Sequence, residues 1–507
     1  MEFRNMTDNL VATFYARQAG HAAKPAIVWN GEVLCTFADL PGHVGRYRAA
    51  LTGLGVKRGD RVMVKADNSP QFAFTYLAVL ASGAIFVPLN TAYTAAEVAL
   101  LVEDAEPVLL VHGEGTPVPD PTDGVMRATL NVDGTGTLSE RAAAATPDLR
   151  VEPMAASDLA AILFTSGTTG RPKGAMLTHG NLASNVAALF ETWQFSNEDT
   201  ILHALPLFHA HGLFVCLHLG LYSGATLRMM PKFDAAKVIA DLPRVSVFMG
   251  VPTFYTRLLE SKGFTREATS GLRLFISGSA PLLPSVFGAF EARTGHRILE
   301  RYGMTETVMI TSNPYDQAGR IPGTVGFPLP GVSVRVVDAE RRDMPTGEVG
   351  EIEMKGPNQC AGYWRRPEAT AECFFADGYF RTGDTGFLDD KGRLTISGRS
   401  KDLIISGGYN VYPAEIEMLL ADVAGVQDVA VFGVPHPDFG EAVMAAITTS
   451  GPELDMAAMQ ALITGRLAKF KQPKAVEVLD AFPRNAMGKI LKQELRDRYR
   501  DTFERKA

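Results

Sequence analysis

Hydrophobic and polar residues follow two spacings over the first two thirds of the chain. Short apolar runs bounded by turn residues predict strands at 61–65, 85–88, 107–112 and 159–163. Between them lie stretches with helical spacing of apolar residues, at 49–54, 72–80 and 97–104. Helices that alternate with buried strands are typical of parallel sheets covered by helices. The pattern therefore predicts α/β layers from about residue 20 to 330.

The pattern changes after residue 331. Short strands separated by turns are expected at 332–338, 350–356 and 394–398, which predicts a smaller β-rich unit near 329–398. Further on, the pattern predicts a strand and helix at 413–420, a strand at 429–434 and a basic helix at 489–500. These suffice for an independent domain. We therefore expect a domain over 1–398 and a second over 399–507.

Composition narrows the class of protein. The chain has 507 residues, more than one core usually serves. A net charge of −7 argues against a nucleic-acid partner, and no apolar run has the length of a membrane span. Four scattered cysteines predict neither a disulfide framework nor a thiolate zinc site. The first residues do not follow the pattern of a signal peptide. We expect a cytoplasmic enzyme without integral membrane association.

The run 164–174, Phe-Thr-Ser-Gly-Thr-Thr-Gly-Arg-Pro-Lys-Gly, is the most informative segment. Its glycines let backbone N–H groups approach an anion, its hydroxyls donate hydrogen bonds and Lys173 adds a positive charge. This combination predicts a cradle for a polyphosphate. No Gly-Lys-Ser/Thr follows at the spacing of the usual nucleotide P-loop. On composition alone, a flexible surface linker is the alternative.

A second segment, 205–213, contains His209 and His211, and His203 and His218 lie nearby. Two histidines separated by one residue can hold a metal ion. No carboxylate or cysteine stands at ligand spacing, so the sequence favours histidines that pack or line a pocket.

Further segments each suggest one contact with a nucleotide. Small residues at 276–281 allow a flat ring to lie on the backbone. At 300–306, Tyr302 can stack on adenine, Thr305 can donate to a phosphate and Glu306 can hold magnesium. Asp384 can accept both hydroxyls of a ribose. A glycine-bracketed junction at 397–410 suits a hinge, and Lys489 projects from a loop. Each segment alone also fits an ordinary turn or a solvated residue.

Together, in this order, these segments resemble the acyl-adenylate-forming superfamily, which includes acyl-CoA synthetases, peptide-synthetase adenylation domains and firefly-luciferase-like enzymes. The resemblance covers nearly the entire chain. It implies two α/β subdomains plus a β-barrel in a large N-terminal region, followed by a small mobile α+β domain. It also implies that the protein uses ATP, Mg²⁺ and coenzyme A.

The resemblance assigns roles to individual residues. The ATP phosphates would be held by Thr165, Ser166, Gly167, Thr168, Thr169, Gly170 and Lys173, with Thr305 on the α-phosphate. Adenine would lie between Gly278, Ser279, Ala280, Pro281 and Tyr302, the ribose on Asp384 beside Arg399, and Mg²⁺ on Glu306. Lys489 would bridge the acid and the α-phosphate, Lys401 would be the hinge, and Ser406, Gly407, Gly408 and Tyr409 would line the CoA tunnel. Many relatives carry aspartate at the hinge position, so Lys401 is a variant.

The segments 203–214, 250–259, 274–283 and 301–315 are most similar to malonyl-CoA synthetases. That likeness implies that malonate is ligated to CoA through malonyl-adenylate, releasing AMP and pyrophosphate. It places the second carboxylate of malonate on Arg257 and Ser279, with His209 at the edge of the pocket. Helical periodicity alone would leave Arg257 solvated. Tolerance of methylmalonate stays open, and medium-chain or aromatic acids, a luciferase-like oxygenase and a silent nucleotide sensor are the alternatives.

Overall fold

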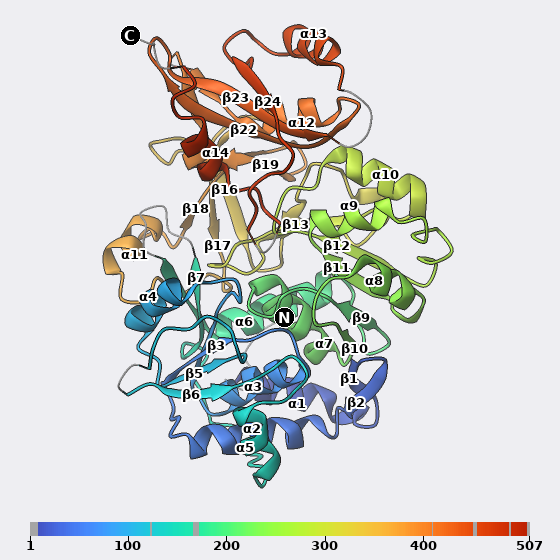
Figure 1. Cartoon of the computed structure of the whole chain (residues 1–507), viewed down its shortest axis with the longest axis vertical. Coiled ribbons are helices and arrows are strands. Elements are labelled where there is room, and N and C mark those ends of the chain that lie inside the picture. The colour runs from blue at the N-terminus through green and yellow to red at the C-terminus, as the bar shows by residue number, and fades with distance from the viewer. Residues whose placement is uncertain are drawn as a thin grey trace.

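The computed structural model describes residues 9–121, 124–165, 172–407, 409–449, 454–485 and 488–503. Two α/β units and a four-stranded antiparallel sheet form a large N-terminal region, and a small C-terminal domain covers one end of it (Figure 1). This arrangement confirms the predicted fold class. No helix within the described ranges is long and apolar enough to span a bilayer.

The first α/β unit contains a six-stranded sheet. Its strand order is β6 (Met126–Thr129), β5 (Leu109–His112), β3 (Arg61–Lys65), β4 (Ile85–Pro88), β7 (Leu159–Thr165) and β8 (Lys173–Thr178). Only the β7–β8 pair is antiparallel. The associated helices are α2 (Leu40–Gly53), α3 (Pro70–Ala81), α4 (Ala95–Ala105) and α5 (Thr137–Ala144). The strands predicted at 61–65 and 85–88 are confirmed, and the predicted helices lie within α3 and α4.

The second α/β unit contains a nine-stranded sheet. Its order is β15 (Phe327–Pro328), β14 (Thr311–Ser312), β13 (Leu299–Tyr302), β12 (Leu274–Ser277), β11 (Val247–Gly250), β9 (Thr200–His203), β10 (Thr226–Met229), β1 (Pro25–Trp29) and β2 (Glu32–Thr36). Its centre, from β13 to β1, is parallel. The helical segments of this part of the chain are α1 (Leu10–Gln18), α6 (His179–Thr192), η2 (His211–Leu217), α7 (His218–Ser223), α8 (Ala235–Asp241), α9 (Pro252–Glu260) and α10 (Pro284–Thr294).

A third sheet follows in the large region. It consists of β16 (Ser333–Val337), β17 (Gly350–Lys355), β18 (Phe380–Leu388) and β19 (Leu394–Arg399), all antiparallel, with α11 (Pro367–Cys373) between the second and third strands. No pairing among the described strands closes this sheet, so the barrel stays a prediction.

The small domain is built on a long hairpin. The hairpin strands β22 (Val426–His436) and β23 (Gly440–Thr449) pair with β20 (Ile404–Ser406), β21 (Tyr409–Val411) and β24 (Ala475–Val478) in one sheet. Helices α12 (Pro413–Ala421), α13 (Met456–Arg466) and α14 (Lys492–Arg498) complete the domain. The helix predicted at 489–500 is shorter because Leu491, with ψ of 79°, is not helical. The boundary predicted at residue 399 stays a prediction; β19 ends there and the short turn η5 (Ser400–Asp402) follows.

Gly326 joins the second sheet to the third. Its carbonyl accepts a hydrogen bond from the backbone N–H of Leu394 in β19, at 2.8 Å. Its φ is +78°, and a Cβ there would lie 2.0 Å from the carbonyl oxygen of Ser312 in β14. Only glycine permits this close crossing. The contact sets the position of β19, which ends in Arg399, relative to the nine-stranded sheet.

The variant Gly326→Ala is expected to lower the thermal unfolding midpoint more than Gly392→Ala does. Gly392 also has positive φ, +77°, but an added Cβ would have no atom within 4 Å. Gly392→Ala should cost about 1 kcal/mol from backbone strain alone, and Gly326→Ala about 2 kcal/mol or more in addition. Differential scanning calorimetry of both variants measures the difference, and equal midpoints would contradict the tight crossing.

Candidate active site

Three of the predicted nucleotide-binding residues meet where β13 approaches the third sheet. The Tyr302 hydroxyl donates to Asp384 Oδ2 at 2.5 Å, and Arg399 Nε lies 3.1 Å from Asp384 Oδ1. Asp384 in β18 and Arg399 in β19 are direct register partners. Asp384 is only 5% exposed, and burial together with its charge raises the pKa of Tyr302. The carboxylate is held in one orientation and keeps lone pairs for two hydroxyl donors.

Glu306 and Lys173 are connected through a residue that sequence reasoning missed. The Tyr363 hydroxyl donates to Glu306 Oε1 at 2.9 Å, and Lys173 Nζ lies 5.4 Å from the centre of the Tyr363 ring. Glu306 is buried, and burial raises the pKa of its carboxyl group. Tyr363 lies far along the chain from both residues and outside every recognised motif. Thr305, next to Glu306, is half-buried.

The predicted phosphate cradle is described at its two ends. Thr165 ends β7 and Lys173 begins β8, and the Thr165 hydroxyl donates to the Lys173 carbonyl at 3.3 Å. Ser166, Gly167, Thr168, Thr169 and Gly170 lie outside the described residues, and so does Gly408 of the predicted CoA tunnel. Their roles stay predictions.

A buried arginine lies at the base of the site. Arg301 in β13 is 4% exposed, and its Nε and Nη2 have no hydrogen-bond partner in the structure. A Cβ on Gly278 would lie 2.2 Å from Arg301 Cζ, so a larger residue at 278 would displace the guanidinium. Burial lowers the pKa of Arg301 to about 9. Buried charges are normally paired. No carboxylate among the described residues pairs with Arg301, so the site favours an anionic ligand.

The neighbouring histidines are uncharged because they are buried beside this arginine. Burial, with a contribution from the Arg301 charge, lowers the pKa of His209 to about 4 and that of His211 well below its ordinary value. Both histidines are therefore neutral near pH 7. His211 Nδ1 lies 3.4 Å from the Ser279 hydroxyl, and Ser279 adopts a positive φ of 71°. The site thus offers polar donors and acceptors beside one buried cation.

The other two histidines have partners of their own. His203 Nε2 lies 2.9 Å from the Gly212 carbonyl, and His218 Nε2 lies 2.7 Å from the Tyr76 hydroxyl. Among the described residues, no group of three His, Cys, Asp or Glu side chains is arranged to hold a metal ion. These contacts fit packing and pocket lining, the role that the sequence favoured.

A cavity of about 420 Å³ opens beside this cluster, between the large region and the small domain. Its wall includes Phe208, Phe233, Phe254, Lys232, Arg257 and Arg484. Arg257, on α9, is exposed and forms no ion pair with a described residue. Helical periodicity therefore correctly predicted that the Arg257 side chain lies outside the core. It did not predict that the side chain lines a cavity. Ala280 and Pro281 follow β12 in a turn and are half-buried and exposed, respectively.

The small domain brings Lys489 into the site. Burial lowers the pKa of Lys489 to about 8, with Arg399 acting in the same direction and Asp384 and Asp402 opposing it. Gly488, which precedes it, lies against α9, since a Cβ there would be 2.8 Å from Thr253 Oγ1. Leu283 of the large region packs on the core of the small domain.

The predicted hinge and CoA-tunnel residues have their described contacts elsewhere. Lys401 lies in η5, on the surface. Ser406 pairs with Tyr409 and Gly440 inside the sheet of the small domain. Tyr409 is 60% exposed and stacks on Phe470 at 4.7 Å, and Gly407 has a positive φ of 59°. Both roles stay predictions.

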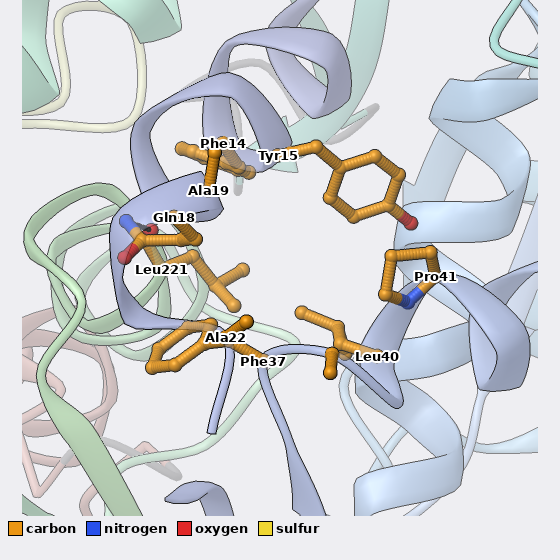
Figure 2. A pocket seen from close by; sticks show the side chains of 10 residues that line it. Phe14, Tyr15, Gln18, Ala19, Ala22, Phe37, Leu40, Pro41 and Leu221 are labelled. Atoms are coloured by element: carbon orange, nitrogen blue, oxygen red, sulfur yellow. Dashed lines mark hydrogen bonds between the residues drawn. The ribbon is translucent and has the colours of Figure 1, made fainter. Parts of the chain in front are cut away.

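A second cavity, of about 210 Å³, lies between α1, the segment after β2, and α7 (Figure 2). Its lining is mostly apolar and includes Phe14, Phe37, Leu40 and Leu221, with Tyr15 at its edge. It shares no residue with the cluster above and brings together no group of opposite or titrating charges. The chemistry is therefore assigned to the first cavity.

The fold and the site are those of a nucleotide-dependent, two-domain enzyme. Residues 14–364 match the family model of the AMP-binding enzymes, and residues 415–489 match the model of the AMP-binding enzyme C-terminal domain. The chain belongs to this family. The crystal structure of ATP-bound MatB from Rhodopseudomonas palustris is 45% identical, covers 98% of this chain and 100% of that chain, and superposes with a TM-score of 0.94. The apo MatB structure, with the same identity and coverage, superposes with 0.84.

Relatives named for different acids have similar sequence identity to this chain. The malonate–CoA ligase of Arabidopsis thaliana is 36% identical over 88% of this chain and 79% of its own length. The feruloyl-CoA synthase of an Amycolatopsis species is 36% identical over 96% of this chain and 97% of its own length. The family and these relatives confirm the predicted class, an AMP-forming acid–CoA ligase.

Adenylate formation by this protein is expected to decline as pH rises through about 8. The role predicted for Lys489, stabilising negative charge at phosphorus, requires the ammonium ion, which is present below the lowered pKa of Lys489 and lost above it. The measurement is kcat/KM for acid-dependent ATP–pyrophosphate exchange from about pH 6.5 to 9.5, because this ratio reports the free enzyme. Lys489→Arg, which stays charged, should lose the decline centred near pH 8 in whatever exchange it retains and keep only one centred near pH 9, where Arg301 loses its charge. The same decline in that variant would contradict the assignment to Lys489.

Proposed function

We propose that this protein ligates malonate to coenzyme A through malonyl-adenylate, with ATP as the energy source. The observation that carries the proposal is two arginines without a carboxylate partner among the described residues: Arg257, which lines the cavity, and Arg301, which is buried in β13 with Nε and Nη2 unpaired. A simple fatty acid or aromatic acid has one carboxylate, which must face ATP. An acid with a second anionic group supplies a partner for these guanidinium groups.

The second carboxylate of malonate would bind Arg301 and Arg257 together, with the Ser279 hydroxyl as an additional donor. Arginine forms two parallel hydrogen bonds with a carboxylate, which fixes the orientation of the acid as well as its charge. His209 and His211 are neutral and can adapt their ring N–H groups to the remaining oxygens. This role for Arg301 extends the sequence-based assignment, which named Arg257, Ser279 and His209.

The reaction has two steps. In the first, the reacting carboxylate oxygen attacks the α-phosphorus of ATP, and the bond to pyrophosphate breaks. Lys489 and the Thr305 hydroxyl donate to the charge that accumulates at phosphorus. In the second step, the sulfur of CoA attacks the acyl carbon, its proton passes to solvent and the bond to AMP breaks. Asp384, oriented by Tyr302 and Arg399, would hold the ribose through both steps.

Magnesium would bind Glu306. This buried carboxylate keeps Oε2 for a metal while Tyr363 occupies Oε1. A single protein carboxylate is sufficient, because Mg²⁺ is usually completed by substrate phosphates and water. The ion would neutralise phosphate charge near Lys173. Localisation in the cytoplasm, the hinge at Lys401 and the CoA tunnel are part of this proposal and rest on the sequence.

An aromatic or medium-chain acid is the second candidate. Phe233 and Phe254 stack at 3.9 Å and, with Phe208, give the cavity an apolar wall. The similarity to a feruloyl-CoA synthase supports the same candidate. A silent nucleotide sensor is less well supported, since Lys489 and Glu306 are both present and lie in the site.

Purified protein should therefore be assayed for ATP- and CoA-dependent AMP formation with malonate, methylmalonate, succinate, acetate, octanoate, benzoate and ferulate. The highest kcat/KM is expected with malonate. A higher value with ferulate, benzoate or octanoate would overturn the proposed substrate and select the second candidate. ATP binding without AMP formation from any of these acids would favour the silent nucleotide sensor instead.

Arg257→Ala is expected to lower kcat/KM for malonate by about 10- to 100-fold, the range set by one lost charge-assisted hydrogen bond. Lys262→Ala is the matched control, because Lys262 is exposed just after α9 and does not line the cavity. The control should match wild type. An unchanged kcat/KM in Arg257→Ala would show that this arginine does not bind the acid.

A further inference from the structure

One guanidinium of the small domain connects its sheet to the loop that carries Lys489. Arg484 Nη2 donates to Asp428 Oδ2 in β22 at 2.5 Å. Arg484 Nη1 donates to the carbonyl oxygen of Gly488, also at 2.5 Å. Since Gly488 directly precedes Lys489, Arg484 is hydrogen-bonded to the peptide group that joins these two residues.

Several further contacts of the described loop residues act within the loop or at its ends. The backbone N–H of Asn485 donates to the Lys489 carbonyl at 2.9 Å, and the Lys489 N–H donates to Asn485 Oδ1 at 3.0 Å. Phe482 and Ile490 pack on the apolar core beside β22 and β23. These contacts shape the loop and fix its base. Among the described residues, the Asp428–Arg484–Gly488 chain links the sheet to the peptide beside Lys489.

The position of that peptide group matters for catalysis. Gly488 has φ of +75° and lies close to Thr253 of α9, so the loop has little room to move toward the large region. The Lys489 ammonium must at the same time stay near Asp384 and Arg399. An error of about 1 Å in the position of a catalytic group can cost about 100-fold in rate.

We propose that Arg484, anchored by Asp428, is a positioning residue that holds Lys489 in place for adenylate formation. The proposal rests on the proposed function, in which Lys489 acts in the first step. Thioester formation from a preformed adenylate needs no charge from Lys489 at phosphorus. The role of Arg484 is therefore confined to the first half-reaction.

Arg484 also lines the cavity, together with Arg257 and Lys232, which suggests a rival role as a direct ligand of the acid. The two roles differ in a measurable way. A direct ligand changes KM for the acid and does not depend on Asp428. A positioning residue changes kcat, and removal of Asp428 reproduces its loss.

The experiment compares Arg484→Ala, Arg484→Lys and Asp428→Asn in the full-length protein. Malonate-dependent ATP–pyrophosphate exchange measures the first half-reaction, and CoA-dependent consumption of synthetic malonyl-adenylate measures the second. Arg466→Ala and Asp480→Asn are matched controls, because both residues are exposed on the small domain and outside the loop. Thermal midpoints of all variants report folding.

In Arg484→Ala and Asp428→Asn, kcat for exchange should fall by about 10- to 100-fold, with KM for malonate and the second half-reaction unchanged. Arg484→Lys should fall between Arg484→Ala and wild type, because a single ammonium bridges Asp428 and the Gly488 carbonyl less well than a planar guanidinium does. Both controls should behave as wild type.

Equal losses in the two half-reactions would overturn the proposal in favour of a general structural role. A rise in KM confined to the Arg484 variants would overturn it in favour of direct binding of the acid. If wild type exchanges with another acid but not with malonate, the proposed substrate fails, and the same variants tested with that acid decide the positioning role separately.

Discussion

Positive charge held without a counter-ion among the described residues is the constraint on which the site depends. Arg301 is almost fully buried on β13, and two of its nitrogens have no hydrogen-bond partner within the described part of the chain. An isolated ion in such surroundings costs several kcal/mol, so an anionic ligand would be stabilised here. Burial, with a smaller contribution from the Arg301 charge, keeps His209 and His211 neutral, which makes them hydrogen-bonding groups rather than further cations. Gly278 exists as glycine because the guanidinium occupies the space of a side chain.

The site is assembled from two sheets of the large region and from the small domain. The nine-stranded sheet supplies Arg301 and Tyr302, the antiparallel sheet supplies Asp384 and Arg399, and the small domain supplies Lys489. The glycine crossing at Gly326 connects the first two sheets. The small domain reaches the site through the close approach of Gly488 to α9 and the packing of Leu283.

Much of the architecture could be predicted from hydrophobic spacing. The strands at 61–65 and 85–88 have the predicted bounds, because short apolar runs between turn residues leave few alternatives. The helix predicted at 489–500 is shorter, since the backbone of Leu491, with ψ of 79°, lies outside the helical region. Spacing could not place Arg257, because a residue on the polar side of a helix can face either solvent or a cavity. Tyr363 gave no signal at all, as its role comes from a contact with a distant carboxylate.

The sequence by itself determined the class of the protein. The chemistry of three features depends on local backbone freedom and residue type, which the sequence shows directly. These features are the segments rich in glycine and hydroxyl residues, Tyr302-Gly-Met-Thr-Glu306, and the loop lysine. Only the tertiary structure decided which charges share a cavity and which have partners. The reason is physical: burial and pairing depend on elements hundreds of residues apart. Packing leaves Arg301 without a partner among the described residues and keeps His209 neutral. Packing also brings Arg484 within hydrogen-bond distance of the Lys489 loop.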